Sequence, residues 1–235
     1  GGGDAVVKLW SIAAGREIAA LRGHFEAVNG VAFHPNGRLL ASASADKTVK
    51  LWDVGERRET LTLHGHDDDV LAVAFTPDGA RLASGGWDRT IRLWEVSRLK
   101  PAHYPVSGGG INAICFHPTR PLLAAGTQDG AVALWDTSPP REIRRLRGHH
   151  GAAWCAAFSQ DGRWLASGCD DGAVRLWNVA DGEEAAVFSG HADAVLSVAF
   201  SPDSRLLASG SRDHTIRLRR VADGREMAIL AGHAD

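Results

Sequence analysis

Short apolar runs of five to seven residues alternate with polar turns along the chain, at a spacing of roughly ten residues. In one representative stretch the pattern predicts four strands, over residues 28–33, 39–44, 48–54 and 59–63. The turn HPNGR after the first run combines a proline, which presets φ, with a glycine, which accepts positive φ. No long stretch shows the 3.6-residue apolar period of an amphipathic helix. The pattern therefore predicts an all-β chain of four-stranded antiparallel meanders.

The four-strand pattern recurs with a nearly constant period. A Gly-His pair marks it at Gly23-His24, Gly65-His66, Gly148-His149, Gly190-His191 and Gly232-His233. The long gap before Gly148 holds one degenerate unit, in which Val106-Ser107 takes the place of the pair, so that the step is always 41 or 42 residues. An aspartate marks the same period at Asp4, Asp46, Asp88, Asp129, Asp171 and Asp213. Six residues after each come Trp10, Trp52, Trp94, Trp135, Trp177 and, breaking the series, Arg219. One repeat position thus holds five of the eight tryptophans, whereas the chain has a single tyrosine.

These units resemble WD40 repeats, the blades of a β-propeller. The resemblance rests on the Gly-His pairs, on the aspartate six residues before each tryptophan, and on Trp52-Asp53 and Trp135-Asp136. It covers essentially the whole chain and implies a radial array of four-stranded blades. We expect a single domain over 1–235, with a half-blade at 1–23 and complete blades at about 24–65, 66–106, 107–148, 149–190 and 191–232. Because 235 residues do not make a whole number of units, the chain is expected to be a segment of a seven-bladed ring. A closed six-bladed ring with one incomplete blade is the alternative.

The resemblance also implies a hydrogen-bonded network in each blade, from Trp to Ser to His to Asp. It is complete in three blades, as His24, Ser42, Asp46 and Trp52, as His66, Ser84, Asp88 and Trp94, and as His149, Ser167, Asp171 and Trp177. The blade at 107–148 has Ser107 and Ala125 in place of the histidine and the serine, and the last blade has Arg219 in place of the tryptophan. A serine, a histidine and an aspartate also invite a catalytic interpretation. A set copied from blade to blade is a fold signature, so we expect no catalytic residue and no enzyme.

Composition and charge exclude several other classes. The net charge of −2 gives no electrostatic reason to bind nucleic acid or an acidic membrane. No run of about 18 apolar residues predicts a transmembrane helix. The three cysteines are too scattered to predict a disulfide framework or a zinc site, and they fit reduced thiols in a cytoplasmic protein. We therefore expect no metal and no cofactor. The excess of Arg over Lys, 22 to 4, suggests a bacterial genome rich in G and C.

Function is expected on the loops at the top face of the propeller, because rigid scaffolds carry binding residues on loops. In the family, this face includes the residue before the turn aspartate and the residue five after the histidine. The positions that match and that we predict to bind a partner are Trp87, Gln128, Asp170 and Arg212, and Asn29, Leu71, Asn112, Trp154 and Leu196.

Three functions are compatible with this reading. The first is a scaffold that binds a peptide or a partner domain on the top face. The second is a regulatory or sensor module whose partners are other domains of the same longer chain, such as an ATPase or a kinase. A propeller enzyme is a remote third. An active site would need an inward-facing titratable residue with a partner that only one blade carries, and the sequence offers none.

Overall fold

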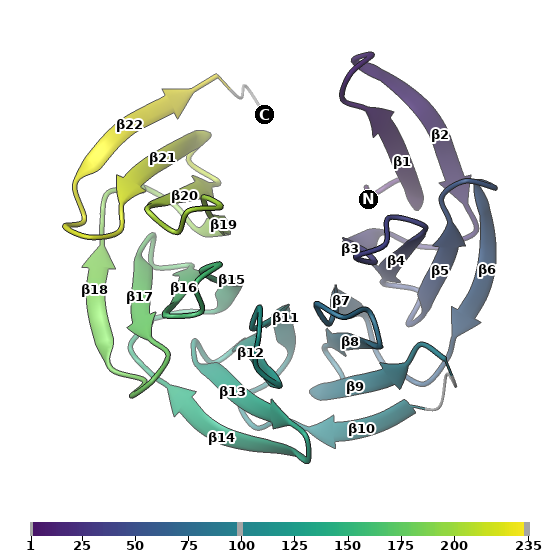
Figure 1. Ribbon diagram of the computed structural model, residues 1–235, viewed down its shortest axis with the longest axis horizontal. Helices are drawn as coiled ribbons and strands as arrows, with labels where there is room; N and C mark the ends of the chain where they lie inside the picture. The colour runs from purple at the N-terminus through teal and green to yellow at the C-terminus, as the bar shows by residue number, and fades with distance from the viewer. Residues whose placement is uncertain (1, 98–100, 233–235) are drawn as a thin grey trace. The chain divides into compact units, whose positions relative to one another are not determined.

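The protein is built from β-strands alone in the residues that the computed structural model describes, 2–97 and 101–232 (Figure 1). The described strands form one two-stranded sheet and five four-stranded sheets, all antiparallel and joined in the order of the sequence. Both the all-β prediction and the prediction of a half-blade followed by four-stranded blades are confirmed. No helix that could cross a membrane is present in the described part of the chain. The last Gly-His pair includes His233, which lies outside the described residues.

Two compact units divide the chain, one ending at Ile111 and the other beginning at Asn112. The first unit contains the half-blade and two blades. Its strands are β1 (Val6–Ser11) and β2 (Arg16–Arg22), then β3 (Val28–Phe33), β4 (Leu39–Ser44), β5 (Val49–Asp53) and β6 (Arg58–Leu63), then β7 (Val70–Phe75), β8 (Arg81–Gly86), β9 (Thr90–Glu95) and β10 (Pro101–Pro105).

The second unit contains three blades. Its strands are β11 (Ile111–Phe116), β12 (Leu122–Thr127), β13 (Val132–Thr137) and β14 (Pro140–Leu146), then β15 (Ala153–Phe158), β16 (Trp164–Cys169), β17 (Val174–Asn178) and β18 (Glu184–Phe188), then β19 (Val195–Phe200), β20 (Leu206–Ser211), β21 (Thr215–Arg220) and β22 (Glu226–Ala231).

The burial of each strand explains its composition. The second strand of a blade is covered on both faces, as β16 is at five of its six positions, because neighbouring sheets of the same unit pack against it. Its small residues, such as Ala166 and Ser167, let the sheets approach closely. The fourth strand of a blade is an edge strand and is more exposed. In β14 the exposed positions are Arg141, Ile143 and Arg144. This difference accounts for the apolar runs and the polar runs of the sequence.

Trp52 and its repeats fill the space between neighbouring blades of one unit. Trp52 lies 1% exposed in a cluster with Val7, Leu9 and Leu40, and so packs on the half-blade. Trp94 packs in the same way on the sheet of β3–β6, and Trp177 on the sheet of β11–β14. The repeated tryptophan is therefore the side chain that joins one blade to the blade before it.

The register between the second and third strands differs by one residue from the register that the sequence predicts. A turn centred near residue 46 or 47 predicts Ser42 beside Leu51 or Trp52, but Ser42 pairs with Lys50 and Trp52 pairs with Leu40. The turn is centred on Asp46 itself, so that Ser42 and Trp52 are diagonal neighbours on one face of the sheet, within reach of each other. The third strand also begins one residue later than predicted, at Val49, because Thr48 binds the turn aspartate.

The repeated tryptophan is buried in one blade and exposed in the half-blade, so replacing it by alanine is expected to have very different effects. Trp52 is 1% exposed whereas Trp10, its counterpart in the half-blade, is 59% exposed. Trp52→Ala is expected to lower the free energy of unfolding by about 3–5 kcal/mol, through lost burial and the cavity that remains. Trp10→Ala is expected to lower it by about 1 kcal/mol or less. Urea unfolding followed by circular dichroism measures both, and equal losses would contradict the packing described.

Candidate functional site

The network of the first complete blade runs from the third strand to the turn. Trp52 Nε1 donates to Ser42 Oγ at 2.8 Å, and Ser42 Oγ lies 2.7 Å from His24 Nε2. His24 Nδ1 lies 2.7 Å from Asp46 Oδ2. The turn holds Asp46 in place, because Thr48 donates its hydroxyl and its N–H to Oδ1 at 2.6 and 3.0 Å. Every buried polar group of this set thus has a partner, as burial requires.

The second blade repeats this geometry closely. His66 lies 2.7 Å from both Asp88 Oδ2 and Ser84 Oγ, and Trp94 donates to Ser84 at 2.9 Å. Burial by itself would raise the pKa of the Asp88 carboxyl. The hydrogen bond and charge of His66, with the bonds from Thr90, outweigh that effect and lower the pKa to about 2. Asp88 is therefore ionised, and its carboxylate stabilises the blade through its bond to His66.

The serines of the complete networks cannot act as nucleophiles on a substrate. Ser42, Ser84 and Ser167 are 0% exposed, and each accepts the N–H of a buried tryptophan. A nucleophile needs an open site beside it. The network thus positions the loops, and its serines are closed to a ligand.

The blade at 111–146 has replaced the network by other contacts. Ser107 is exposed, and Asp129 accepts instead from Thr127 Oγ1 at 2.5 Å. Arg145 and Arg147 lie 3.8 and 3.7 Å from the Asp129 carboxylate. Trp135 is 8% exposed, against 1 or 2% for the tryptophans of the complete networks. The turn survives because its aspartate keeps other donors.

The last blade keeps three members of the network. His191 lies 2.9 Å from Asp213 Oδ2 and 2.8 Å from Ser209 Oγ. Arg219 stands at the tryptophan position, where it pairs with Glu226 at 3.1 Å and its guanidinium lies over the Phe188 ring. An open pocket of about 860 Å³ lies here, lined among others by Leu176, Phe188 and Arg219. The pocket is at the place that the other blades fill with an indole.

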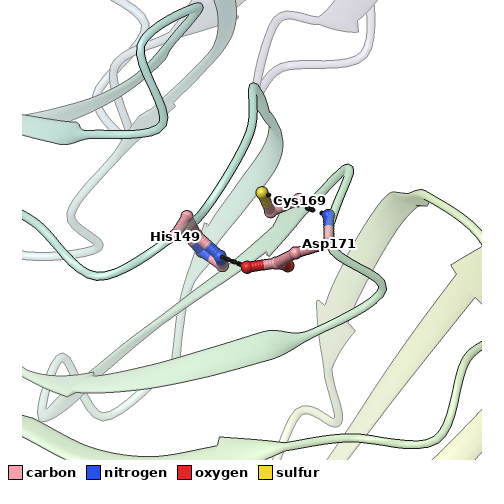
Figure 2. A group of neighbouring side chains, drawn as sticks. All are labelled: His149, Cys169 and Asp171. Atoms are coloured by element: carbon pink, nitrogen blue, oxygen red, sulfur yellow. Dashed lines mark hydrogen bonds and ion pairs between the residues drawn. The ribbon is translucent and has the colours of Figure 1, made fainter.

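The blade at 149–190 contains a cluster that the sequence did not reveal. His149 keeps its contact with Ser167, at 2.7 Å, but its Nδ1 lies 3.5 Å from Asp171 Oδ2 and has no hydrogen-bond partner. Cys169 lies beside the pair, as Figure 2 shows, and one ligand atom from each of the three residues lies within 4.8 Å of the others. Burial raises the pKa of the Cys169 thiol to about 12 and lowers the pKa of His149 to about 4. The sequence analysis predicted no metal site, because the three cysteines are far apart along the chain.

Top-face positions of the first unit differ in accessibility. Trp87 is 49% exposed, and its indole lies against Gly110, where an added Cβ would be 2.5 Å from the ring. Asn29 is exposed and donates its side-chain amide to Val70 O at 3.0 Å. Leu71 is half-buried. One side of the Trp87 ring therefore packs on Gly110, and the other side is exposed to solvent.

Top-face positions of the second unit include one pair that the structure brings together. Trp154 Nε1 donates to Asp170 Oδ1 at 2.5 Å, so the two predicted residues form one element of the surface. Gln128 and Arg212 are exposed, and Leu196 is 44% exposed. Asn112 differs from the others because it is buried and donates to Ala153 O at 3.3 Å. That contact gives Asn112 a structural role in joining neighbouring blades.

Comparison with known families agrees with this architecture. The family model described as the IFT122 first beta-propeller matches residues 54–234, and the model described as WD domain, G-beta repeat matches residues 15–53. The chain is thus a WD40 β-propeller protein. More particularly, it belongs to the family of the first of these models, which covers more than half of its length. A search of curated proteins gives no match.

The pKa of Asp88 predicts a contribution to acid unfolding. Its stabilisation is fully present above the unfolded pKa of about 4 and is lost as the pH falls through the folded pKa of about 2. Between pH 4 and 2, the free energy of unfolding of the unmodified protein is expected to fall by about 2 kcal/mol more than that of Asp88→Asn. Asp129→Asn is the control, because Asp129 has no histidine partner. Parallel pH profiles for the unmodified protein and Asp88→Asn would contradict the assignment.

The pocket beside Arg219 predicts a stabilising substitution. In Arg219→Trp the indole is expected to pack on Leu176 and Phe188 and to donate to Ser209, completing the network of the last blade. The expected gain in the free energy of unfolding is about 1–2 kcal/mol. Arg225→Trp, at an exposed position outside the pocket, is the control and is expected to give no gain. Thermal melts followed by circular dichroism compare them, and a lower melting temperature for Arg219→Trp would show that the Glu226 pair matters more.

Proposed function

We propose that this protein is an interaction scaffold that binds a peptide or a partner domain through the top-face loops of its blades. WD40 β-propellers generally bind protein partners, and this chain has that fold. The observation that carries the proposal is Trp87, a large aromatic side chain left 49% exposed on a turn whose backbone is fixed by the blade. Tryptophan is enriched at binding hot spots because it offers a large contact area at a small loss of conformational entropy.

The loops around Trp87 support the proposal by their rigidity. Trp87 N donates to Asp69 O at 2.9 Å, which ties the turn to the loop that precedes the first strand of the blade. Asp88, the next residue, is held by His66 and Thr90. A preorganised aromatic side chain loses little further freedom on binding. In the second unit, the hydrogen bond from Trp154 to Asp170 preorganises that pair in the same way. Arg212 and Gln128, at the equivalent turn positions of other blades, are exposed.

The partner is proposed to be protein. The described surface carries the mixed charge of a chain with net charge −2, which favours neither nucleic acid nor an acidic membrane. Cys115, Cys155 and Cys169 are free thiols, which fits a reducing compartment, and we propose the cytoplasm.

A second candidate function is a regulatory or sensor module within a longer protein, whose partners are other domains of the same chain. One observation favours it: the family model that matches residues 54–234 is described as a first propeller. The same top-face residues would serve this function. Sequencing the complete reading frame distinguishes the two, because an enzyme domain such as an ATPase or a kinase in the same chain favours the regulatory module.

Truncating Trp87 tests the scaffold. Trp87→Ala is expected to raise the dissociation constant for the principal partner about 30-fold, which corresponds to a hot spot of about 2 kcal/mol. The partner is identified by affinity purification from the source cells with quantitative mass spectrometry, and the constant is measured with the purified partner.

Ile143→Ala is the matched control, since Ile143 is 47% exposed but lies on β14, a fourth strand. The control is expected to bind as the unmodified protein does. Equal binding by Trp87→Ala, with its fold intact by circular dichroism, would overturn the role of Trp87.

A further inference from the structure

Two substitutions set the blade at 149–190 apart from its neighbours, and both flank the turn aspartate of the network. The position two residues before the turn aspartate holds Ser44 and Ser211 in two other blades, and it holds Cys169 here. The position two residues after it holds threonine in the three other blades that have a network histidine, and it holds Ala173 here. Cys169 Sγ makes the contacts of the serine hydroxyls, donating to Gly151 O at 3.1 Å and accepting from Asp171 N at 3.5 Å, whereas at Ala173 a hydroxyl is lost.

The lost hydroxyl has a defined role in two of the other blades. Thr215 Oγ1 lies 2.7 Å from Asp213 Oδ1 and 3.2 Å from His191 Nδ1, and so bridges the two side chains. Thr48 makes the same bridge, at 2.6 Å to Asp46 and 3.4 Å to His24. Ala173 cannot form it. In its absence the histidine and the aspartate stand further apart, at 3.5 Å rather than 2.7–2.9 Å.

His149 is left with a buried nitrogen that makes only a long contact. Its side chain is 0% exposed, and Nδ1 lies 3.5 Å from Asp171 Oδ2 with no hydrogen-bond partner. Burying a polar atom without a hydrogen bond is unfavourable. The other ring nitrogen, Nε2, is already engaged with Ser167 at 2.7 Å. A ligand at Nδ1 would remove this penalty.

We propose that His149 Nδ1, Cys169 Sγ and the Asp171 carboxylate bind a zinc ion, with water as the fourth ligand. One ligand atom from each residue lies within 4.8 Å of the others, and Figure 2 shows the three side chains gathered at the turn. Imidazole, thiolate and carboxylate are the ligands that Zn²⁺ takes in proteins.

The separations in this blade suit a shared ion better than those in its neighbours. With zinc–ligand bonds of about 2.0–2.3 Å, two ligand atoms of a tetrahedral site stand about 3.4–3.6 Å apart. His149 Nδ1 and Asp171 Oδ2 already stand at 3.5 Å. The 2.7 Å between His24 and Asp46 is a hydrogen-bond distance that leaves no room for an ion. Cys169 Sγ, which donates to Gly151 O at 3.1 Å, must leave that carbonyl and move closer to the ion.

The surroundings of the cluster support the ion. Ser167 Oγ can accept Nε2–H and orient the imidazole, as the outer partners of metal-binding histidines do. Asp171 keeps its place through the N–H groups of Ala173 and His150, which donate to its two oxygens at 3.0 and 3.1 Å. Its side chain is 15% exposed, which gives the ion a way in and the water ligand a place. Bound zinc would tie the loop at His149 to the turn at Asp171, in place of the missing threonine bridge.

Cobalt and zinc binding test the site. Co²⁺ added to the reduced full chain is expected to give a thiolate-to-metal absorption band in the near ultraviolet, and Zn²⁺ is expected to displace it. Cys169→Ser is expected to abolish the band and to weaken Zn²⁺ binding, measured by calorimetry, by more than the roughly 10–100-fold that loss of an outer partner brings. Cys169→Ser is expected to fold, since Ser44 and Ser211 occupy the same position in other blades.

Two further variants separate this site from other thiols and from a structural effect. Cys115→Ser removes a thiol of another blade and is expected to keep the band unchanged. Ala173→Thr restores the hydroxyl, is expected to close the gap between His149 and Asp171, and should weaken Zn²⁺ binding about tenfold or more while keeping every ligand. The absence of a band in the unmodified protein, or a band of equal strength in Cys169→Ser, would overturn the proposal.

Discussion

The burial of an indole N–H between blades is the constraint on which each complete blade depends. The tryptophan must be buried to join one sheet to the next, and its nitrogen then needs an acceptor inside the protein. Ser42 provides it in the first complete blade, and the serine in turn is fixed by a histidine from the loop before the first strand. The histidine reaches the aspartate of the turn. One chain of hydrogen bonds therefore extends from the packing between blades to the loops at their ends.

Because the network fixes these loops from within, their neighbouring positions are free to differ. Asp88 and Asp171 occupy equivalent turns of two blades, yet the residue before Asp88 is Trp87 and the residue before Asp171 is Asp170. The exposed Trp87 ring and the Trp154–Asp170 pair are thus carried on equivalent backbones with different side chains. A repeated frame with variable loop positions suits the interaction surface that we propose, because it separates the residues that hold the fold from the exposed loop residues.

Most of the strands could be predicted because each apolar run ends at a turn with its own chemistry, as at HPNGR. The exact register could not be predicted, because it depends on whether the turn is centred on Asp46 or on the bond after it. A shift of one residue changes which side chains face each other. The pairing of Trp154 with Asp170 escaped prediction because it depends on side-chain rotamers. The cluster around His149 also escaped, since Cys169 was counted as one of three scattered cysteines. Aligning the repeats by position reveals it: a serine becomes cysteine, and the threonine four residues later becomes alanine.

The blades form an internal series of variants on one design, and the series shows what each member of the network contributes. Where the histidine and serine are both absent, Asp129 still holds its turn through Thr127 and two arginines. Where only the tryptophan is absent, the rest of the network keeps hydrogen-bond distances and a pocket opens beside Arg219. Where alanine replaces the threonine and cysteine stands two residues before the aspartate, the histidine and aspartate lie 3.5 Å apart and a buried nitrogen has no hydrogen-bond partner. The threonine hydroxyl bridges histidine and aspartate in two blades, so its loss at Ala173 removes one of the contacts that keep such a pair together.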